Sequence, residues 1–128
     1  IKDFPSDNLA QPIALNVSES WPKTEHDVIF SANTAHIMQP QEVEKMIANG
    51  AGSLPSRGLF CLYGPFIFEN TALAKSNLKF NRKLQDLHPG MGIRKFDDLN
   101  VLALAGSMKL LEINSMPANN HLLVWQKI

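Results

Sequence analysis

The chain is short of the residues that build disulfide frameworks and metal centres. It holds a single cysteine, Cys61, so no disulfide can form within it. Cys61 lies in an apolar run, which favours a buried thiol in a reducing compartment, and we expect a cytoplasmic protein. A Cys61–histidine nucleophilic pair stays open as an alternative, although a thiol in mid-strand should be protonated. The four histidines show no paired i, i+4 spacing, so nothing favours a zinc site.

Net charge is also absent, because 12 Lys and Arg balance 12 Asp and Glu. This balance gives no support for binding to nucleic acid or to a membrane surface. No apolar run approaches the length of a membrane span, and the first residues lack the apolar region of a signal peptide. The chain also lacks an initiator Met, which is consistent with a processed or truncated product.

The sequence also lacks two kinds of motif, one that binds nucleotides and one that carries a catalytic nucleophile. The sequence contains no G-x-G-x-x-G or other glycine-rich phosphate loop, and no Gly-x-Ser-x-Gly nucleophile elbow. What it does contain is a continuous apolar run at residues 58–66. Such a run is typical of a strand buried on both faces in a parallel sheet. It ends in Tyr63-Gly64-Pro65-Phe66, which either only breaks the strand or marks a site, because ligands of open α/β sheets bind beyond the carboxyl ends of strands.

The remaining pattern predicts one α/β domain over residues 1–128. Strands are expected at residues 12–17, 27–33, 58–64, 108–114 and 121–128, and helices at about 40–52, 71–87 and 97–105. Pro40 suits the first position of the first helix, and Asp97 or Asp98 the cap of the third. The connection between the last two strands is too short for a parallel crossover, so they should form an antiparallel hairpin. The early strands should be parallel.

Polar side chains collect at the ends of these elements. They are Asn16, Asn33, His36, Tyr63, Asn77, Arg94, Asn119 and Asn120. Several follow predicted parallel strands, where an α/β sheet builds a hydrogen-bonding site for a small molecule. Two blander interpretations stay open: Asn77 can simply bond a nearby backbone group, and His36 can be a satisfied loop histidine.

Several of these segments occur in an order that resembles a known family. They are Asn33-Thr-Ala-His36-Ile37, Phe60-Cys-Leu-Tyr63-Gly64-Pro65-Phe66, Ser76-Asn77 with Phe80, Gly92-Ile93-Arg94, and Met116-Pro117-Ala118-Asn119-Asn120. The chain resembles, over nearly its whole length, a poorly characterised family of class I S-adenosylmethionine-dependent methyltransferase-like proteins. The resemblance implies a Rossmann-like sheet that ends in an antiparallel hairpin.

The resemblance also implies roles for individual residues. Asn16 and Val17 would contact the adenine of S-adenosylmethionine, although the family usually has Asp-Val there. Ser31, Ala32 and Asn33 would approach the methionine part of the cofactor. The substrate side would be lined by Ser76, Asn77, Arg94, Asn119 and Asn120, with His36 as the candidate base and Tyr63 orienting the substrate.

One departure from the family carries the main expectation about function. Family members have, upstream, a strand ending in a glycine-rich turn and a strand ending in an acidic residue for the ribose, and neither is present. The chain therefore resembles the C-terminal part of a class I methyltransferase fold, without the first strands of that fold. We expect the cofactor to bind the full-length parent rather than this chain alone. The parent would methylate a small molecule. The alternatives are a non-catalytic binding or assembly scaffold, or a structural domain without a ligand. Because the strand near Ile13 would lack its neighbour, we also expect a homo-oligomer formed through that strand, or a strand that is displaced or re-paired.

Overall fold

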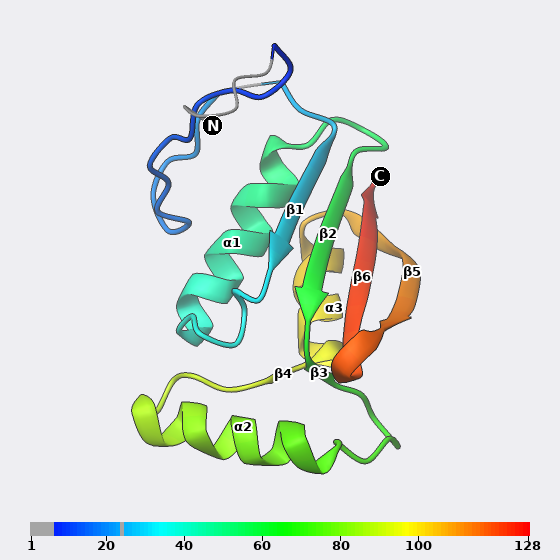
Figure 1. Cartoon of the computed structure of the whole chain (residues 1–128). Coiled ribbons are helices and arrows are strands. Elements are labelled where there is room, and N and C mark those ends of the chain that lie inside the picture. Colours follow the sequence, from blue (N-terminus) through cyan, green and yellow to red (C-terminus); the bar gives the residue numbers. More distant parts are fainter. Residues whose placement is uncertain (1–6, 24) are drawn as a thin grey trace.

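Four strands form a mixed sheet in the order β1-β2-β6-β5 (Figure 1). The computed structural model describes residues 7–23 and 25–128. The strands are β1 (Val28–Ala32), β2 (Leu59–Gly64), β5 (Met108–Met116) and β6 (Asn120–Lys127). β1 and β2 are parallel, whereas β6 runs antiparallel to both β2 and β5. The predicted parallel start and the antiparallel hairpin at the end are both confirmed.

Two helices, α1 (Pro40–Ser53) and α3 (Phe96–Ala105), cover one face of this sheet. β2 alternates between buried and half-buried residues, and its buried members Phe60 and Leu62 belong to the same core as residues of both helices. α1 approaches β2 so closely that a Cβ on Gly50 would lie 2.4 Å from the Phe60 ring. Each fully buried large side chain of this core stabilises the fold by about 1.5–3 kcal/mol.

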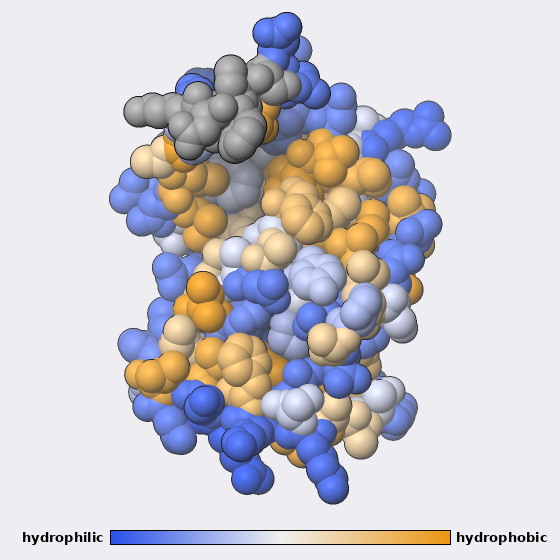
Figure 2. Space-filling view, in the orientation of Figure 1, coloured by the Kyte–Doolittle hydropathy of each residue, from blue (hydrophilic) through white to orange (hydrophobic). Residues whose placement is uncertain are grey.

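The opposite face of the sheet is open, which corrects two expectations. The central strand is not buried on both faces, because Leu59, Cys61 and Tyr63 are only half-buried. The strand near residue 28 is not buried either: it lies at the sheet edge, where Val28 is 53% and Phe30 63% exposed. Figure 2 shows apolar side chains gathered over this part of the sheet. A continuous apolar run does not reveal how many faces of a strand are covered, since that depends on which helices the chain supplies.

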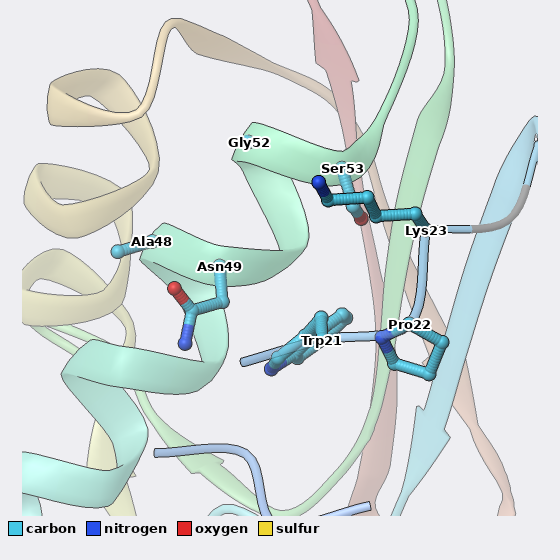
Figure 3. Close-up of a pocket in the computed structure, with 7 residues that line it drawn as sticks. All are labelled: Trp21, Pro22, Lys23, Ala48, Asn49, Gly52 and Ser53. Carbon is cyan, nitrogen blue, oxygen red and sulfur yellow. The ribbon is translucent and has the colours of Figure 1, made fainter. Parts of the chain in front are cut away.

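The predicted strand at residues 12–17 is wrong, and so is the location of the free edge. These residues adopt no regular structure, and Ile13 is 66% exposed. Pro12 has no backbone N–H to donate, and an apolar run needs a neighbouring strand to complete its hydrogen bonds. The segment is instead held against α1 further along, where the Val17 carbonyl accepts hydrogen bonds from Trp21 Nε1 (3.0 Å) and Asn49 Nδ2 (2.8 Å). Figure 3 shows Trp21 beside Asn49 of α1, in a pocket of about 330 Å³.

The remaining α-helix, α2 (Lys75–Leu87), lies across the carboxyl ends of β1 and β2 (Figure 1). It begins four residues later than the sequence predicts. Two short strands that the sequence does not predict flank α2 in the sequence: β3 (Phe66–Ile67) precedes it and β4 (Arg94–Lys95) follows it. The two strands pair in parallel. Asp97 and Asp98 lie in the first turn of α3, where they favour the helix dipole, rather than at its N-cap, which is Lys95. The helices among the described residues are all too short or too polar to span a bilayer.

Candidate functional site at the carboxyl ends of β1 and β2

The carboxyl ends of the two parallel strands lie side by side and bring Asn33 to Tyr63. Ala32 pairs with Tyr63 in the register, and the Asn33 amide donates to the Tyr63 carbonyl at 2.9 Å. Asn33 has a φ of 57°, a left-handed conformation that asparagine adopts more readily than most residues. This turn ends the strand and leads the chain over Gly64, with Asn33 Oδ1 3.7 Å from the position that a Gly64 Cβ would take.

His36 also lies close to Gly64 and is buried, with 7% of its surface exposed. Its Nδ1 is 3.9 Å from the same Cβ position, and its ring contacts the edge of Phe80 from α2 at a centroid distance of 5.4 Å. Burial, and after it the positive charge of Arg94, lowers the pKa of His36 below its usual value of 6.5. The imidazole is therefore neutral near pH 7, which is the form that accepts a proton.

The β5–β6 turn brings two more asparagines to this edge. Asn120 Nδ2 donates to Tyr63 Oη at 3.3 Å, and Asn77 Nδ2 of α2 donates to the Asn119 carbonyl at 3.4 Å. The bond of Asn77 matches the blander interpretation of this residue, and it also ties α2 to the hairpin. Asn33, His36, Tyr63 and Asn120 form what we call the carboxyl-edge cluster.

Arg94 lies beneath the loop that carries His36. Its guanidinium donates to the carbonyls of Ala35 (3.0 Å) and Gly90 (2.9 Å) and to that of Met38. A planar guanidinium can serve several acceptors at once because its N–H groups point in fixed, divergent directions. In this structure Arg94 therefore holds the loop after β1 in place, and its burial lowers its own pKa.

The remaining predicted residues divide into near and distant ones. Ser31 Oγ bonds Thr34 Oγ1 at 2.6 Å, Ala32 is exposed at the end of β1, and Ser76 is exposed in the first turn of α2. Asn16 and Val17 are not brought to this edge. Val17 bonds Asn49 in the second half of α1, one turn before Ser53, which bonds His26 just ahead of β1. They therefore lie toward the amino end of that strand.

Two side chains at this edge were not among the predicted site residues. Phe80 contacts His36, and His121 pairs with Gly64 across β2 and β6. The hairpin turn at residues 117–120 predicts that a strand restarts near residue 121, but the register to Gly64 follows only from the three-dimensional pairing. Among the described residues, no three His, Cys, Asp or Glu gather in a way that could hold a metal ion.

The fold matches part of the fold of several methyltransferases of known structure. An O-methyltransferase family 2 protein from Planctomyces limnophilus, solved with apigenin, matches with a TM-score of 0.75 and 16% identity over 90% of this chain and 33% of its own. Human N-acetylserotonin methyltransferase, solved with SAM, matches with a TM-score of 0.71 and 11% identity over 89% and 32%. An O-methyltransferase family protein from Burkholderia thailandensis matches with a TM-score of 0.76 and 12% identity over 90% and 35%.

The fold is therefore that of part of a class I methyltransferase, and the chain spans about one third of the length of these structures. At such low identities the likeness shows the fold alone. The sequence itself matches a family model over residues 1–127, and the chain belongs to that family, which is described as a protein of unknown function, DUF938.

Proposed function

We propose that this chain is the substrate-side part of an S-adenosylmethionine-dependent methyltransferase that acts on a small molecule. The observation that carries the proposal is the carboxyl-edge cluster, in which Asn33 and His36 both approach Gly64, and Tyr63, the residue before Gly64, is bonded to Asn120. This is where α/β folds bind ligands. The fold shared with small-molecule methyltransferases supports the same assignment.

Each member of the cluster has a role that its surroundings allow. His36, neutral and close to Gly64, is placed to take the proton of an acidic methyl acceptor. Tyr63, whose hydroxyl is bonded by Asn120, orients that acceptor. Asn77 and Asn119 line the far side of the acceptor site. Arg94 keeps the loop that carries His36 in position. Ser76, exposed at the start of α2, completes this side.

The described residues offer only one side of a cofactor site. Ala32 and Asn33 are exposed at the end of β1 and can approach the methionine part of S-adenosylmethionine, with Ser31 behind them. The adenine role of Asn16 and Val17 requires these residues to move away from α1, where Val17 is bonded. We therefore propose that the cofactor binds in a longer parent chain and that the 128 residues alone are inactive.

The experiment is a calorimetric titration with S-adenosylhomocysteine, first of this chain and then of a longer parent that includes the sequence upstream. We expect no saturable binding to the folded 128-residue chain and saturable binding to the parent. Binding to the short chain would overturn its proposed inactivity. A folded parent that does not bind would overturn the methyltransferase proposal itself.

A second candidate function, an assembly scaffold, is favoured by the free edge of β1. Four of the five residues of β1 are apolar, and the strand carries no Lys, Pro or bulge that would discourage pairing with another chain. We propose that any self-association uses β1, rather than the segment near Ile13, which forms no strand. In this candidate the carboxyl-edge cluster is a binding site without catalysis.

Replacing Phe30 by Lys tests this second candidate. Phe30 is 63% exposed, so the change should leave the fold intact while it weakens any association through β1. We expect sedimentation velocity to show a smaller mean mass for Phe30→Lys than for the unmodified chain at the same concentration. The matched control is Leu87→Lys, at a residue that is 77% exposed at the end of α2. An equal drop in the control, or a monomeric unmodified chain, would contradict the scaffold proposal.

A further inference from the structure

A small pocket beside the carboxyl-edge cluster shares Asn77 and Asn119 with the substrate side proposed above, and its other lining residues have no role there. Its volume is about 160 Å³, and it lies between the segment after β2, the start of α2 and the β5–β6 turn. Phe66 and Phe68 form apolar walls, and Asn77, Asn119 and His121 supply polar groups. A cavity of about 150 Å³ is large enough for a benzene ring, so this pocket has room for one ring or a short branched chain.

His121 is the polar group whose bonding is incomplete. Its Nδ1 is sealed from solvent and has no hydrogen-bond partner among the described residues, while its ring contacts Phe68 at a centroid distance of 4.6 Å. Burial lowers the pKa of His121, so the ring is neutral near pH 7. A neutral imidazole carries one N–H, and a buried N–H without an acceptor is rarer in proteins than a buried acceptor without a donor. The proton therefore belongs on Nε2, and His121, which lines the pocket, carries its N–H donor on that nitrogen.

The start of α2 adds positive potential to the same place. The helix has 13 residues, its N-cap is Ala74, no side chain caps it, and its first turn contains no acidic residue. Ala74 lines the pocket, so the unpaired N–H groups of the first turn lie at the pocket wall. The first helical residue is Lys75, whose charge is unfavourable at the positive end of a helix dipole unless an anion is bound there.

From these observations we propose that the pocket binds the carboxylate of a small apolar acid. The acid's ring or branched chain lies against Phe66 and Phe68, and its carboxylate oxygens accept hydrogen bonds from His121 Nε2 and from the first turn of α2. A neutral apolar molecule would leave these donors without partners, and a cation would be repelled by Lys75. The pocket lies next to the Asn77–Asn119 contact, so its occupant would also join α2 to the hairpin.

The test is a ¹⁹F NMR titration of the full 128-residue chain with 4-fluorobenzoate, in the absence of any cofactor. We expect a saturable shift of the fluorine resonance. The uncharged analogue 4-fluorobenzamide, whose carbonyl can still accept a hydrogen bond, should bind at least tenfold more weakly. His121→Phe keeps a ring in place but removes the N–H, and should weaken binding of 4-fluorobenzoate at least tenfold. His88→Phe, at the other end of α2, is the matched control and should bind as the unmodified chain does.

A second variant guards against a folding defect in His121→Phe. Lys75 is exposed, so Lys75→Glu should fold normally and even stabilise α2 through the helix dipole, yet it should weaken binding of the carboxylate at least fivefold. The proposal would be overturned if the unmodified chain showed no saturable shift. It would also be overturned if folded His121→Phe and Lys75→Glu both bound 4-fluorobenzoate as tightly as the unmodified chain does. Neither result bears on the cofactor titration, so the methyltransferase proposal stands or falls separately.

Discussion

Ala118, in the turn between β5 and β6, has a φ of 61° and a ψ of 34°. This left-handed conformation brings the Cβ of an L-residue close to the backbone and costs about 1–2 kcal/mol. Glycine has no such cost, although it loses more entropy on folding. We therefore expect Ala118→Gly to raise the free energy of unfolding by about 0.5 kcal/mol.

Urea denaturation measures this effect, and a matched control is available in α1. Ala48 is exposed in the interior of that helix, where the same change to glycine should lower the free energy of unfolding by about 1 kcal/mol. Opposite signs for one substitution at two sites would support the conformational explanation. A loss of stability in both variants would show that Ala118 is not strained.

Arg94 combines a mechanical and an electrostatic effect on His36. Arg94→Lys keeps the positive charge but cannot serve three carbonyls at once, so it should reduce stability by about 2 kcal/mol with little effect on the pKa of His36. Arg94→Met removes the charge as well and should raise that pKa toward its usual value, because Arg94 is the second cause of its depression after burial. Histidine NMR titration separates the two variants, and identical titration curves would count against the charge effect.

At the scale of elements, α2 differs from the helices that cover the sheet. α1 buries Val43, Met46, Ile47, Gly50 and Ala51. α2 buries only Leu84 and is otherwise fixed by single contacts, such as the hydrogen bond from the Ile93 amide to Asn81 Oδ1 at 2.8 Å. Helices with few buried apolar contacts open at lower free energy than the core.

We expect amides of residues 75–87 to exchange with deuterium faster than those of residues 40–53 in hydrogen-exchange mass spectrometry. Saturation with 4-fluorobenzoate should slow exchange in the first segment and leave the second unchanged, since the proposed pocket lies at the start of α2. Equal protection of the two helices in the free chain would contradict this ranking.

The same contrast explains what the sequence could and could not predict. The helix over residues 40–53 and the final hairpin follow from local signals, namely Pro40 at the first helical position and a short connection at residues 117–119. The apolar run at 12–17 carries the same local signal as a strand, yet the part of the chain that the structure describes pairs no strand with it. Whether a strand forms depends on neighbours that a local pattern does not contain.

The candidate site shows the same limit. The sequence singled out Asn33, His36 and Tyr63 because they follow apolar runs, and the structure places them around Gly64. The sequence did not place His121 there, because its neighbour Gly64 lies 57 residues earlier in the chain and the pairing depends on the sheet register. Nor could residue type reveal that the guanidinium of Arg94 is bonded to backbone carbonyls.

For the whole molecule, the buried His36 and the half-buried His121 predict a loss of stability in acid. The pKa values of His36 and His121 are lower in the folded chain than their usual value of 6.5. The unfolded chain therefore binds protons below about pH 6.5 that the folded chain does not. Above that pH both histidines are neutral in the folded and the unfolded chain, and the stability that depends on their neutral form is fully present. That stability is lost as the pH falls toward their lowered folded-state pKa values.

Urea denaturation at pH 7.5 and pH 5.5 checks this prediction. The unmodified chain should be less stable at the lower pH, and a variant with both His36→Gln and His121→Gln should lose less stability between the two. An undiminished difference in that variant would show that the dependence comes from other groups.

The two tryptophans make this chain its own optical probe. Trp125 is fully buried, and its ring stacks near Phe96 while its Nε1 bonds Asn100 Oδ1. Trp21 is half-buried on the surface of α1 (Figure 3). Emission from Trp125 therefore reports the melting of the sheet core, and emission from Trp21 reports release of the segment that precedes β1. A Trp21→Phe variant leaves Trp125 as the single tryptophan. Subtracting the emission of this variant from that of the unmodified chain leaves the emission of Trp21, which reports detachment of that segment alone. Such a detachment would occur if an upstream part of the fold bound those residues instead of α1.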